Sequence, residues 1–213
     1  MGRPSNTNER QSQIARALLP VMAKKGYDGA TVADVAKVAD IAPGLLHYHF
    51  KNKLEILLAA IVELEADYET RLDEALSGAS SKPAAELDAF IDAHLHVGAG
   101  ADPVALACWI NVTGEALREP RVRRAVERVL ASALFRLRSI LERGTKEGAF
   151  ACREPDVAAA AILATIQGYF VLAATARPLI PEGSASRATR AMALALAGRP
   201  APLAKRRPTR RAR

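Results

Sequence analysis

The sequence predicts an all-α protein, and three observations support this fold class. Apolar residues recur every three or four positions along most of the chain, and no segment alternates apolar with polar residues as a half-buried strand does. Ala, Leu, Arg and Glu are abundant, and Pro and Gly separate the periodic segments. A length of 213 residues allows a small first domain and a larger second one. We expect about nine to ten helices.

The first helix is expected over residues 9–25. Ile14, Leu18, Val21 and Met22 form one apolar stripe, and Gly26 follows as a residue able to adopt the left-handed conformation that ends a helix. This stripe should pack on the next two helices.

Residues 31–53 predict two short helices joined by a tight turn. Thr31 is a good N-cap, and Asp34 occupies the reciprocal position of a capping box. Pro43 closes the turn and opens the second helix, because proline is tolerated in a first helical turn but disfavours helix in the residue before it. Leu46 and Phe50 then share the core-facing side.

The outward side of this second helix has an unusual composition for a surface exposed to water. It carries aromatic, imidazole and aliphatic groups beside a glycine that permits close approach, namely Pro43, Gly44, Leu45, His47, Tyr48 and His49. Such a surface suits a DNA groove, which presents sugars, methyl groups, base edges and phosphates.

These residues resemble the N-terminal part of TetR-family transcriptional regulators. The matching pattern covers roughly the first fifty-five residues and includes Tyr27, Ala30-Thr31-Val32 and Gly44-x-Leu46-His47-x-His49-Phe50-x-x-Lys53. Three positions depart from the usual pattern: Asp40 replaces a turn glycine, Ala42 replaces a capping Ser or Thr, and His47 replaces a phosphate-contacting Tyr. Loss of the cap costs about 1 kcal/mol.

The resemblance implies a three-helix DNA-binding domain joined by a long helix to a ligand-binding and dimerisation domain. We expect the N-terminal arm and helix-turn-helix over residues 1–53, the second domain over 54–198 and a basic tail over 199–213. The predicted DNA contacts are Arg3, Thr31, Pro43, Gly44, Leu45, His47, Tyr48, His49, Lys51 and Lys53.

Charge is distributed unevenly in a way that fits DNA binding. Residues 1–53 contain eight Lys/Arg against four Asp/Glu, residues 54–198 contain fifteen against nineteen, and residues 199–213 contain seven against none. Basic ends attract phosphate through counterion release, whereas the mildly acidic centre does not compete for it. The tail could strengthen DNA binding nonspecifically or have no role.

A long helix is expected to follow Asn52, whose side chain caps it while Glu55 completes a second capping box. Its apolar stripe continues to Leu72, so this helix should link the two domains and transmit movement between them. Further helices are predicted over residues 83–97, two within 103–119, one over 120–147 and one over 156–177.

The helix over residues 156–177 is apolar on nearly every side, so it must be covered all round. A membrane span is one alternative by length. It is disfavoured because Ala dominates and Thr165, Gln167 and Thr175 interrupt the segment. The resemblance implies instead a four-helix dimer bundle built from the helices over 120–147 and 156–177 of each subunit. The predicted interface residues are Val126, Leu130, Leu134, Leu137, Ala160 and Ala164.

A small-molecule pocket is expected where the helices of the second domain converge. Its candidate lining combines aromatic and polar side chains, namely Phe90, His94, Cys108, Trp109, Thr113, Gln167 and Phe170. The same residues could be ordinary core. The stretch from Trp109 to Glu115-Ala-Leu-Arg-Glu-Pro120 resembles the TetR subgroup that includes choline-responsive regulators.

Nothing in the sequence favours catalysis, a cofactor or a metal. His94 and His96 are two apart, which separates them around a helix, and no zinc-protease, nucleotide-loop or nucleophile-elbow motif is present. Cys108 and Cys152 lack a paired spacing and are expected to stay reduced. No secretory signal is visible, so the cytoplasm is the expected compartment.

Together these observations predict a homodimeric, cytoplasmic DNA-binding regulator, expected to be a repressor, that leaves a pseudo-palindromic operator when a small molecule binds. The alternative is an architectural or nonspecific nucleic-acid-binding dimer without an effector. Operator preference over random DNA separates the two.

Overall fold

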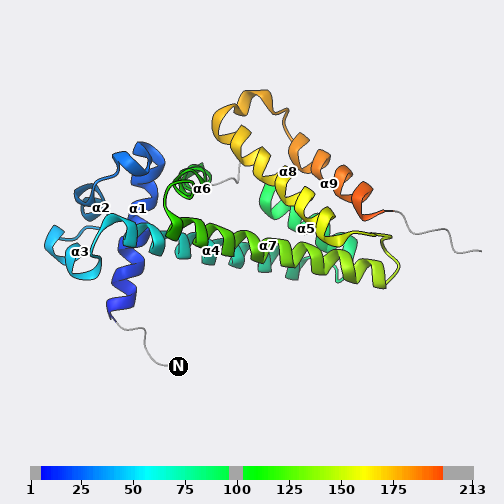
Figure 1. The fold of residues 1–213 in the computed structure, drawn as a ribbon, viewed down its shortest axis with the longest axis horizontal. Helices are drawn as coiled ribbons and strands as arrows, with labels where there is room; N and C mark the ends of the chain where they lie inside the picture. The colour runs from blue at the N-terminus through cyan, green and yellow to red at the C-terminus, as the bar shows by residue number, and fades with distance from the viewer. Residues whose placement is uncertain (1–5, 96–102, 199–213) are drawn as a thin grey trace, which may run out of the picture.

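The computed structural model describes residues 6–95 and 103–198. Within these ranges the chain forms nine α-helices and one short 3-10 helix, with no strand, so the predicted all-α class is confirmed. Helices α1 (Asn6–Gly29), α2 (Val32–Val38) and α3 (Pro43–His49) gather at one end of the molecule (Figure 1).

The first three helices are held together by apolar side chains and by a few specific hydrogen bonds. Ile14 and Leu18 of α1 and Leu46 of α3 are wholly or almost wholly buried, as the periodicity predicts. The backbone of Gly26 has a φ of 71°, so regular helix stops there as expected, although one more helical turn follows to Gly29. Gln13 Nε2 donates to the carbonyl oxygen of Ala39 at 2.7 Å and ties α1 to the end of α2.

The turn between α2 and α3 has the geometry that its sequence predicts. The backbone N–H of Asp34 donates to Thr31 Oγ1 at 3.1 Å, and that of Thr31 donates to Asp34 Oδ2 at 3.1 Å, which completes the capping box. Asp40 has a φ of 53°, a left-handed conformation that Asp tolerates better than most side chains. Ala42 makes no side-chain cap, also as expected. These features fix the angle at which α3 leaves the turn.

Helix α4 (Lys53–Gly78) runs from this three-helix head along the second domain (Figure 1). Asn52 Oδ1 caps it by accepting from the N–H of Glu55 at 3.0 Å. The predicted reciprocal bond differs, because Glu55 Oε2 accepts from the N–H of Lys51, at 2.8 Å, and not from that of Asn52. Arg16 of α1 pairs with Glu63 of α4 at 2.8 Å, which fastens the head to the long helix.

The second domain comprises α5 (Pro83–Leu95), α6 (Pro103–Glu115), α7 (Pro120–Lys146), α8 (Pro155–Thr175), the 3-10 helix η1 (Arg177–Leu179) and α9 (Ser184–Ala197). Two predictions need correction. Residues 103–119 form one helix followed by a turn, whereas two helices are predicted there. Helix α9 lies in a segment for which no helix is predicted from the sequence. Arg190 of α9 pairs with Asp88 at 2.8 Å and Asp92 at 2.7 Å, both on α5, so the added helix is fastened to the domain.

Helix α7 packs mainly against its own chain, which corrects part of the predicted dimer interface. Leu137 is wholly buried in the core of the second domain, and Val126 is buried in the core shared with the head. Leu130 and Leu134 are partly buried against the same cores. The apolar stripe of α7 is therefore largely buried within its own chain: Leu137 has no exposed surface, and Val126 is only 7% exposed.

Helix α8 is the one helix in the described ranges that is long and apolar enough to cross a membrane by length and composition, yet only 28% of its most apolar window is buried. Its inner side contacts α7 and α9. Its outer side is a stripe of small and apolar residues at helical spacing, namely Val157, Ala160, Ala164, Gly168 and Val171, all exposed. We refer to these five residues as the α8 stripe.

Gly144 on α7 allows the chain after α7 to pack closely. A Cβ there would overlap the ring of Phe150 and lie 3.0 Å from Cβ of Pro83. We expect Gly144→Ala to lower the free energy of unfolding by about 1–3 kcal/mol, as overpacking does. Urea unfolding at fixed protein concentration measures this. Gly114→Ala, where nothing lies within 4 Å of the added Cβ, is the control and should show no loss; equal stability of the two variants would contradict the prediction.

Candidate nucleic-acid interface and ligand cavity

The outer side of α3 is as open as the sequence predicts. Tyr48 is 79% exposed and Leu45 40% exposed, and Pro43, Gly44 and His47 lie on the same exposed surface. Nothing lies within 4 Å of a Cβ built on Gly44, so a flat partner can approach the backbone there. Leu46 and Phe50 hold the helix from beneath.

His49 and Thr31 are more constrained than the other candidate DNA contacts. His49 is half-buried with its ring edge against Tyr48, at a centroid distance of 5.1 Å, and its Nδ1 is buried without a hydrogen-bond partner. The hydroxyl of Thr31 lies 2.7 Å from Asp34 Oδ2 within the capping box. Hydrogen bonds from Lys25 and Thr31 hold the pKa of Asp34 at about 2, so this carboxylate stays charged. Thr31 is exposed and remains accessible from outside.

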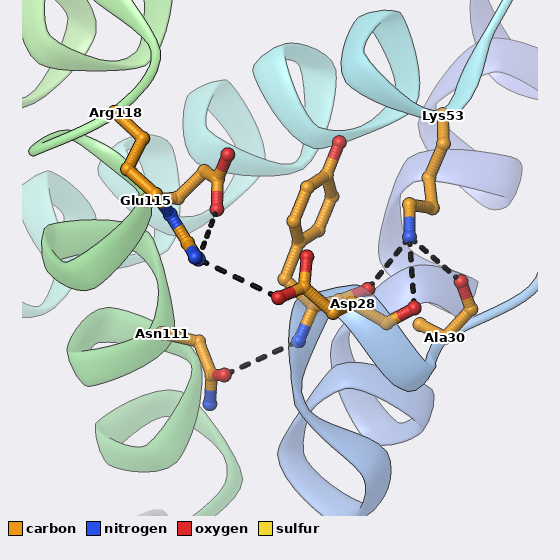
Figure 2. Close-up of polar contacts among 7 residues, drawn as sticks. Asp28, Ala30, Lys53, Asn111, Glu115 and Arg118 are labelled. Atoms are coloured by element: carbon orange, nitrogen blue, oxygen red, sulfur yellow. Dashed lines mark hydrogen bonds and ion pairs between the residues drawn. The ribbon is translucent and has the colours of Figure 1, made fainter.

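The two candidate lysines after α3 have different surroundings. Lys51 is exposed. The ammonium group of Lys53, in contrast, donates to the carbonyl oxygens of Tyr27 at 2.8 Å, Ala30 at 3.1 Å and Asp28 at 3.3 Å (Figure 2). Its charge holds the segment that precedes α2, and a phosphate contact of Lys53 stays a prediction. Arg3, the remaining candidate, lies outside the described residues.

Helix α6 holds the same segment from the opposite side (Figure 2). Asn111 Oδ1 accepts from the N–H of Tyr27 at 3.2 Å, and Arg118, just after the helix, pairs with Asp28 at 3.5 Å and Glu115 at 3.1 Å. Residues 27–30 thus lie between Lys53 of α4 and Asn111 of α6. Sequence patterns gave no sign of this junction, because the contacts of Asn111 with Tyr27 and of Arg118 with Asp28 join residues far apart in the chain.

A cavity of about 380 Å³ lies in the second domain between α4, α5, α6, α7 and α8. This volume is within the range of small-molecule sites, at its lower end. Most of the lining is aliphatic or aromatic. Four predicted residues line it, namely His94, Trp109, Gln167 and Phe170, and the sequence missed others, among them Leu64, Glu65, Tyr68 and Arg71 of α4.

Three predicted pocket residues do not line the cavity. Phe90 is wholly buried and supports the ring of His94 from behind, with centroids 4.3 Å apart. Cys108 is buried on the other side of α6, where its thiol donates to the carbonyl oxygen of Leu19 at 3.1 Å. The hydroxyl of Thr113 donates to the carbonyl oxygen of Ile110 in its own helix. Helical periodicity places residues on a side of a helix but does not say which sides enclose a cavity.

Two hydrogen-bonded pairs form the polar part of the cavity wall. Tyr68 Oη lies 2.7 Å from His94 Nε2, and His94 Nδ1 lies 2.7 Å from the carbonyl oxygen of Phe90. Trp109 Nε1 donates to Gln167 Oε1 at 2.8 Å. Burial lowers the pKa of His94 to about 4 and raises that of Tyr68, so both side chains are neutral at physiological pH.

The low pKa of His94 predicts loss of stability in acid. The unfolded chain has a His pKa near 6.5, so between about pH 6.5 and pH 4 it binds a proton that the folded chain does not. The free energy of unfolding should therefore fall by roughly 3 kcal/mol as the pH is lowered through this window. Chemical unfolding at several pH values measures it. His94→Gln should remove this component, and identical pH dependence in both proteins would contradict the assignment.

Within residues 6–95 and 103–198, no three His, Cys, Asp or Glu side chains are grouped as metal ligands would be. Cys108 and Cys152 are both buried, and neither forms a disulfide bond in the part of the chain that the structure describes.

The capped helix-turn-helix with an open second helix, joined to a helical domain around a cavity, is the architecture of helix-turn-helix transcriptional regulators. Two family models match the chain: "Bacterial regulatory proteins, tetR family" over residues 14–60 and "BetI-type transcriptional repressor, C-terminal" over residues 83–198. The chain belongs to the TetR family of transcriptional regulators and has a C-terminal domain of the BetI type. The resemblance inferred from the sequence is confirmed.

The proteins similar in sequence to this chain include a BetI regulator and a regulator of fatty acid metabolism. The HTH-type transcriptional regulator BetI of Paraburkholderia phymatum is 29% identical over 115 residues, which cover 54% of this chain and 58% of that protein. The fatty acid metabolism regulator protein of Bacillus subtilis is 27% identical over 136 residues, which cover 64% of this chain and 68% of that protein. The match to the Paraburkholderia protein thus spans little more than half of its length.

Solved structures share the fold. A transcriptional regulator from Saccharomonospora viridis in complex with choline has a TM-score of 0.75 at 20% identity, covering 87% of this chain and 94% of that chain. The regulator FadR from Bacillus subtilis in complex with stearoyl-CoA has a TM-score of 0.72 at 22% identity, covering 86% of this chain and 97% of that chain. At these identities the likeness establishes the all-α fold and its arrangement.

Proposed function

We propose that the protein is a cytoplasmic, homodimeric transcriptional repressor that leaves its operator when a small molecule fills the cavity. One observation carries this proposal: α4 starts at the head beside α3 and also lines the cavity, so one helix contacts both sites. Repressor activity is favoured over activation because the matched C-terminal model is that of a repressor. The division into residues 1–53, 54–198 and 199–213 is part of the proposal.

The proposed DNA-reading surface is the open side of α3. Leu45, His47 and Tyr48 would meet base edges and sugars, while Gly44 allows close approach. Lys51 would contact phosphate, and Thr31 would lie beside the backbone. Lys53 acts on DNA indirectly, by holding residues 27–30 and with them the start of α2. Arg3 stays a proposed contact on the sequence argument alone.

The proposed dimer interface is the α8 stripe, together with exposed apolar residues of α9. Ala160 and Ala164, both predicted from the sequence, lie in the middle of the stripe. Small side chains there would let two helices approach closely and bury the apolar surface that one chain leaves open. Two heads would then read half-sites roughly 34–36 Å apart or a multiple of this distance.

Two helices could carry the effector signal. Helix α4 has Lys53 at the head and Tyr68 at the cavity, and α6 has Asn111 at the head and Trp109 at the cavity. A ligand that binds one head spacing more tightly than the other shifts the population toward it. Only this difference in affinity can drive release.

Selection of bound fragments from a random pool of duplex DNA tests the function. We expect a pseudo-palindromic sequence to be enriched and to bind about 10³-fold or more tightly than random DNA at the same salt concentration. Binding that depends steeply on salt but shows no preference would support the alternative, an architectural or nonspecific DNA-binding dimer. Deletion of residues 199–213 is the companion test, and it should weaken background binding while leaving operator preference in place.

A further inference from the structure

The hydrogen bonds around the cavity determine which polar groups remain for a ligand. The carbonyl oxygen of Phe90 can only accept, so His94 Nδ1 must carry the proton that it donates there. A neutral imidazole then has a lone pair on Nε2, and the phenol of Tyr68 must donate to it at 2.7 Å. The phenol proton is thereby used, and Tyr68 Oη offers the cavity only its acceptor capacity.

The second pair, Trp109 and Gln167, leaves a hydrogen-bond donor for a ligand. Indole N–H can only donate, so the atom of Gln167 that faces Trp109 Nε1 is the amide oxygen. The amide NH₂ of Gln167 then points elsewhere, and it has no hydrogen-bond partner among the described residues. The cavity therefore combines one acceptor on α4 with one donor on α8, in a lining that is otherwise mainly apolar.

The charged residues near the cavity do not supply a site for a charged ligand. Glu65 pairs with Arg128 at 3.3 Å, and Glu69, outside the lining, pairs with Arg136 and accepts from Ser132. Arg71 lines the cavity but is exposed, and an ion pair at an exposed site contributes only about 0–1 kcal/mol. No described residue of the lining therefore offers a buried, unpaired charge with which a charged ligand would form an ion pair.

We propose that the cavity binds a neutral, largely hydrocarbon molecule with one hydroxyl or amide group, which donates to Tyr68 Oη and accepts from the amide NH₂ of Gln167. This inference rests on the proposed function, because it defines the effector class for the same cavity. A quaternary ammonium ion is the competing ligand class, because the rings of Tyr68, Trp109 and Phe170 in the lining would attract it by cation–π contact without a carboxylate.

The sequence contains one tryptophan, Trp109, and it lies in the cavity wall, so its fluorescence reports binding in the full-length protein. Four probes share an eight-carbon chain and differ in the polar group: octan-1-ol, octanamide, octanoate and octyltrimethylammonium. We expect saturable changes with the alcohol and the amide, at affinities at least about tenfold higher than those for the two charged probes. Tighter binding of either charged probe, or no change with any of the four, overturns the proposal.

The double variant Tyr68→Phe/His94→Leu tests the acceptor, because it removes the phenol together with the imidazole lone pair that the phenol covers. Loss of one hydrogen bond should weaken octan-1-ol binding about fivefold to tenfold relative to octanoate. Tyr169→Phe is the matched control, because it removes a phenol from α8 outside the described cavity lining. An unchanged ratio of octan-1-ol to octanoate affinity in the double variant overturns the assignment. Operator preference is measured separately with DNA, so a wrong ligand class and a wrong function give different results.

Discussion

Replacing Ala164 with glutamate should dissociate the dimer and abolish operator binding. Ala164 lies at the centre of the exposed α8 stripe, between Ala160 and Gly168. In a two-fold interface the substitution introduces two carboxylates at once, close together and without a partner. Burying such charges costs on the order of several kcal/mol, so the dissociation constant of the dimer should rise by roughly 10³-fold.

Sedimentation or light scattering at micromolar protein concentration measures the change in mass, and binding to a selected operator measures the loss of function. Ala84→Glu is the matched control, because Ala84 is exposed in the first turn of α5, where a carboxylate is tolerated. A dimeric Ala164→Glu protein with normal operator affinity would show that the subunits meet elsewhere.

Replacing both His47 and Tyr48 with alanine should remove sequence preference while the fold is retained. Both side chains are exposed, so their loss opens no cavity in the head. Each head would lose contacts worth about 1–3 kcal/mol, and a dimer loses them twice. Competition between operator and random DNA at fixed salt should therefore show the preference falling by at least about 10²-fold, with unfolding unchanged.

Two variants that each remove one positive charge distinguish the reading of DNA bases from general electrostatic attraction to DNA. Lys51→Ala should weaken binding to operator and random DNA alike and reduce the slope of affinity against salt concentration by about one. Lys146→Ala removes the same charge at the end of α7, far along the chain from the head, and should change neither. If the variant with both His47→Ala and Tyr48→Ala still prefers the operator over random DNA, α3 is not the helix that reads the bases.

The head could be predicted from sequence almost residue by residue, because its structure is determined by local signals. The Thr31 and Asp34 capping box, Pro43 at the start of α3 and the uncapped Ala42 all appear as expected. Each depends on residues at most a few positions apart. The role of Lys53 could not be predicted in this way, since the carbonyl groups that it holds are more than twenty residues earlier in the chain.

The second domain was less predictable, because periodicity shows that a helix has a buried side without showing what covers it. The stripe of α7 was assigned to a partner subunit, yet Leu137 is buried in its own chain. Helix α9 is amphipathic, but the side chains that it buries are small, namely Ala185, Thr189, Ala193 and Ala197, and no helix is predicted there from the sequence. The last two long helices predicted from the sequence lie over residues 120–147 and 156–177, whereas the last two helices in the described part of the chain are α8 and α9.

The lining of the cavity, likewise, could be predicted from the sequence only in part. His94, Trp109, Gln167 and Phe170 were found because aromatic and polar side chains are conspicuous in apolar helices. Tyr68 lies within the apolar stripe of α4, but the sequence does not distinguish a side chain that faces the core from one that faces a cavity. Its pairing with His94, which decides the polarity of the site, depends on two different helices.

Trp109 and Asn111 are only two residues apart on α6, with the indole at the cavity and the amide at the backbone of Tyr27. A helix of this length shifts as a rigid rod, so an adjustment around the indole is transmitted to the amide. A genetic screen can select mutants of this protein that stay bound to the operator when the small-molecule effector is present. We expect such a screen to return substitutions at Asn111, Glu115 and Arg118. Such mutants would keep normal affinity for both inducer and DNA and would lack only the communication between them.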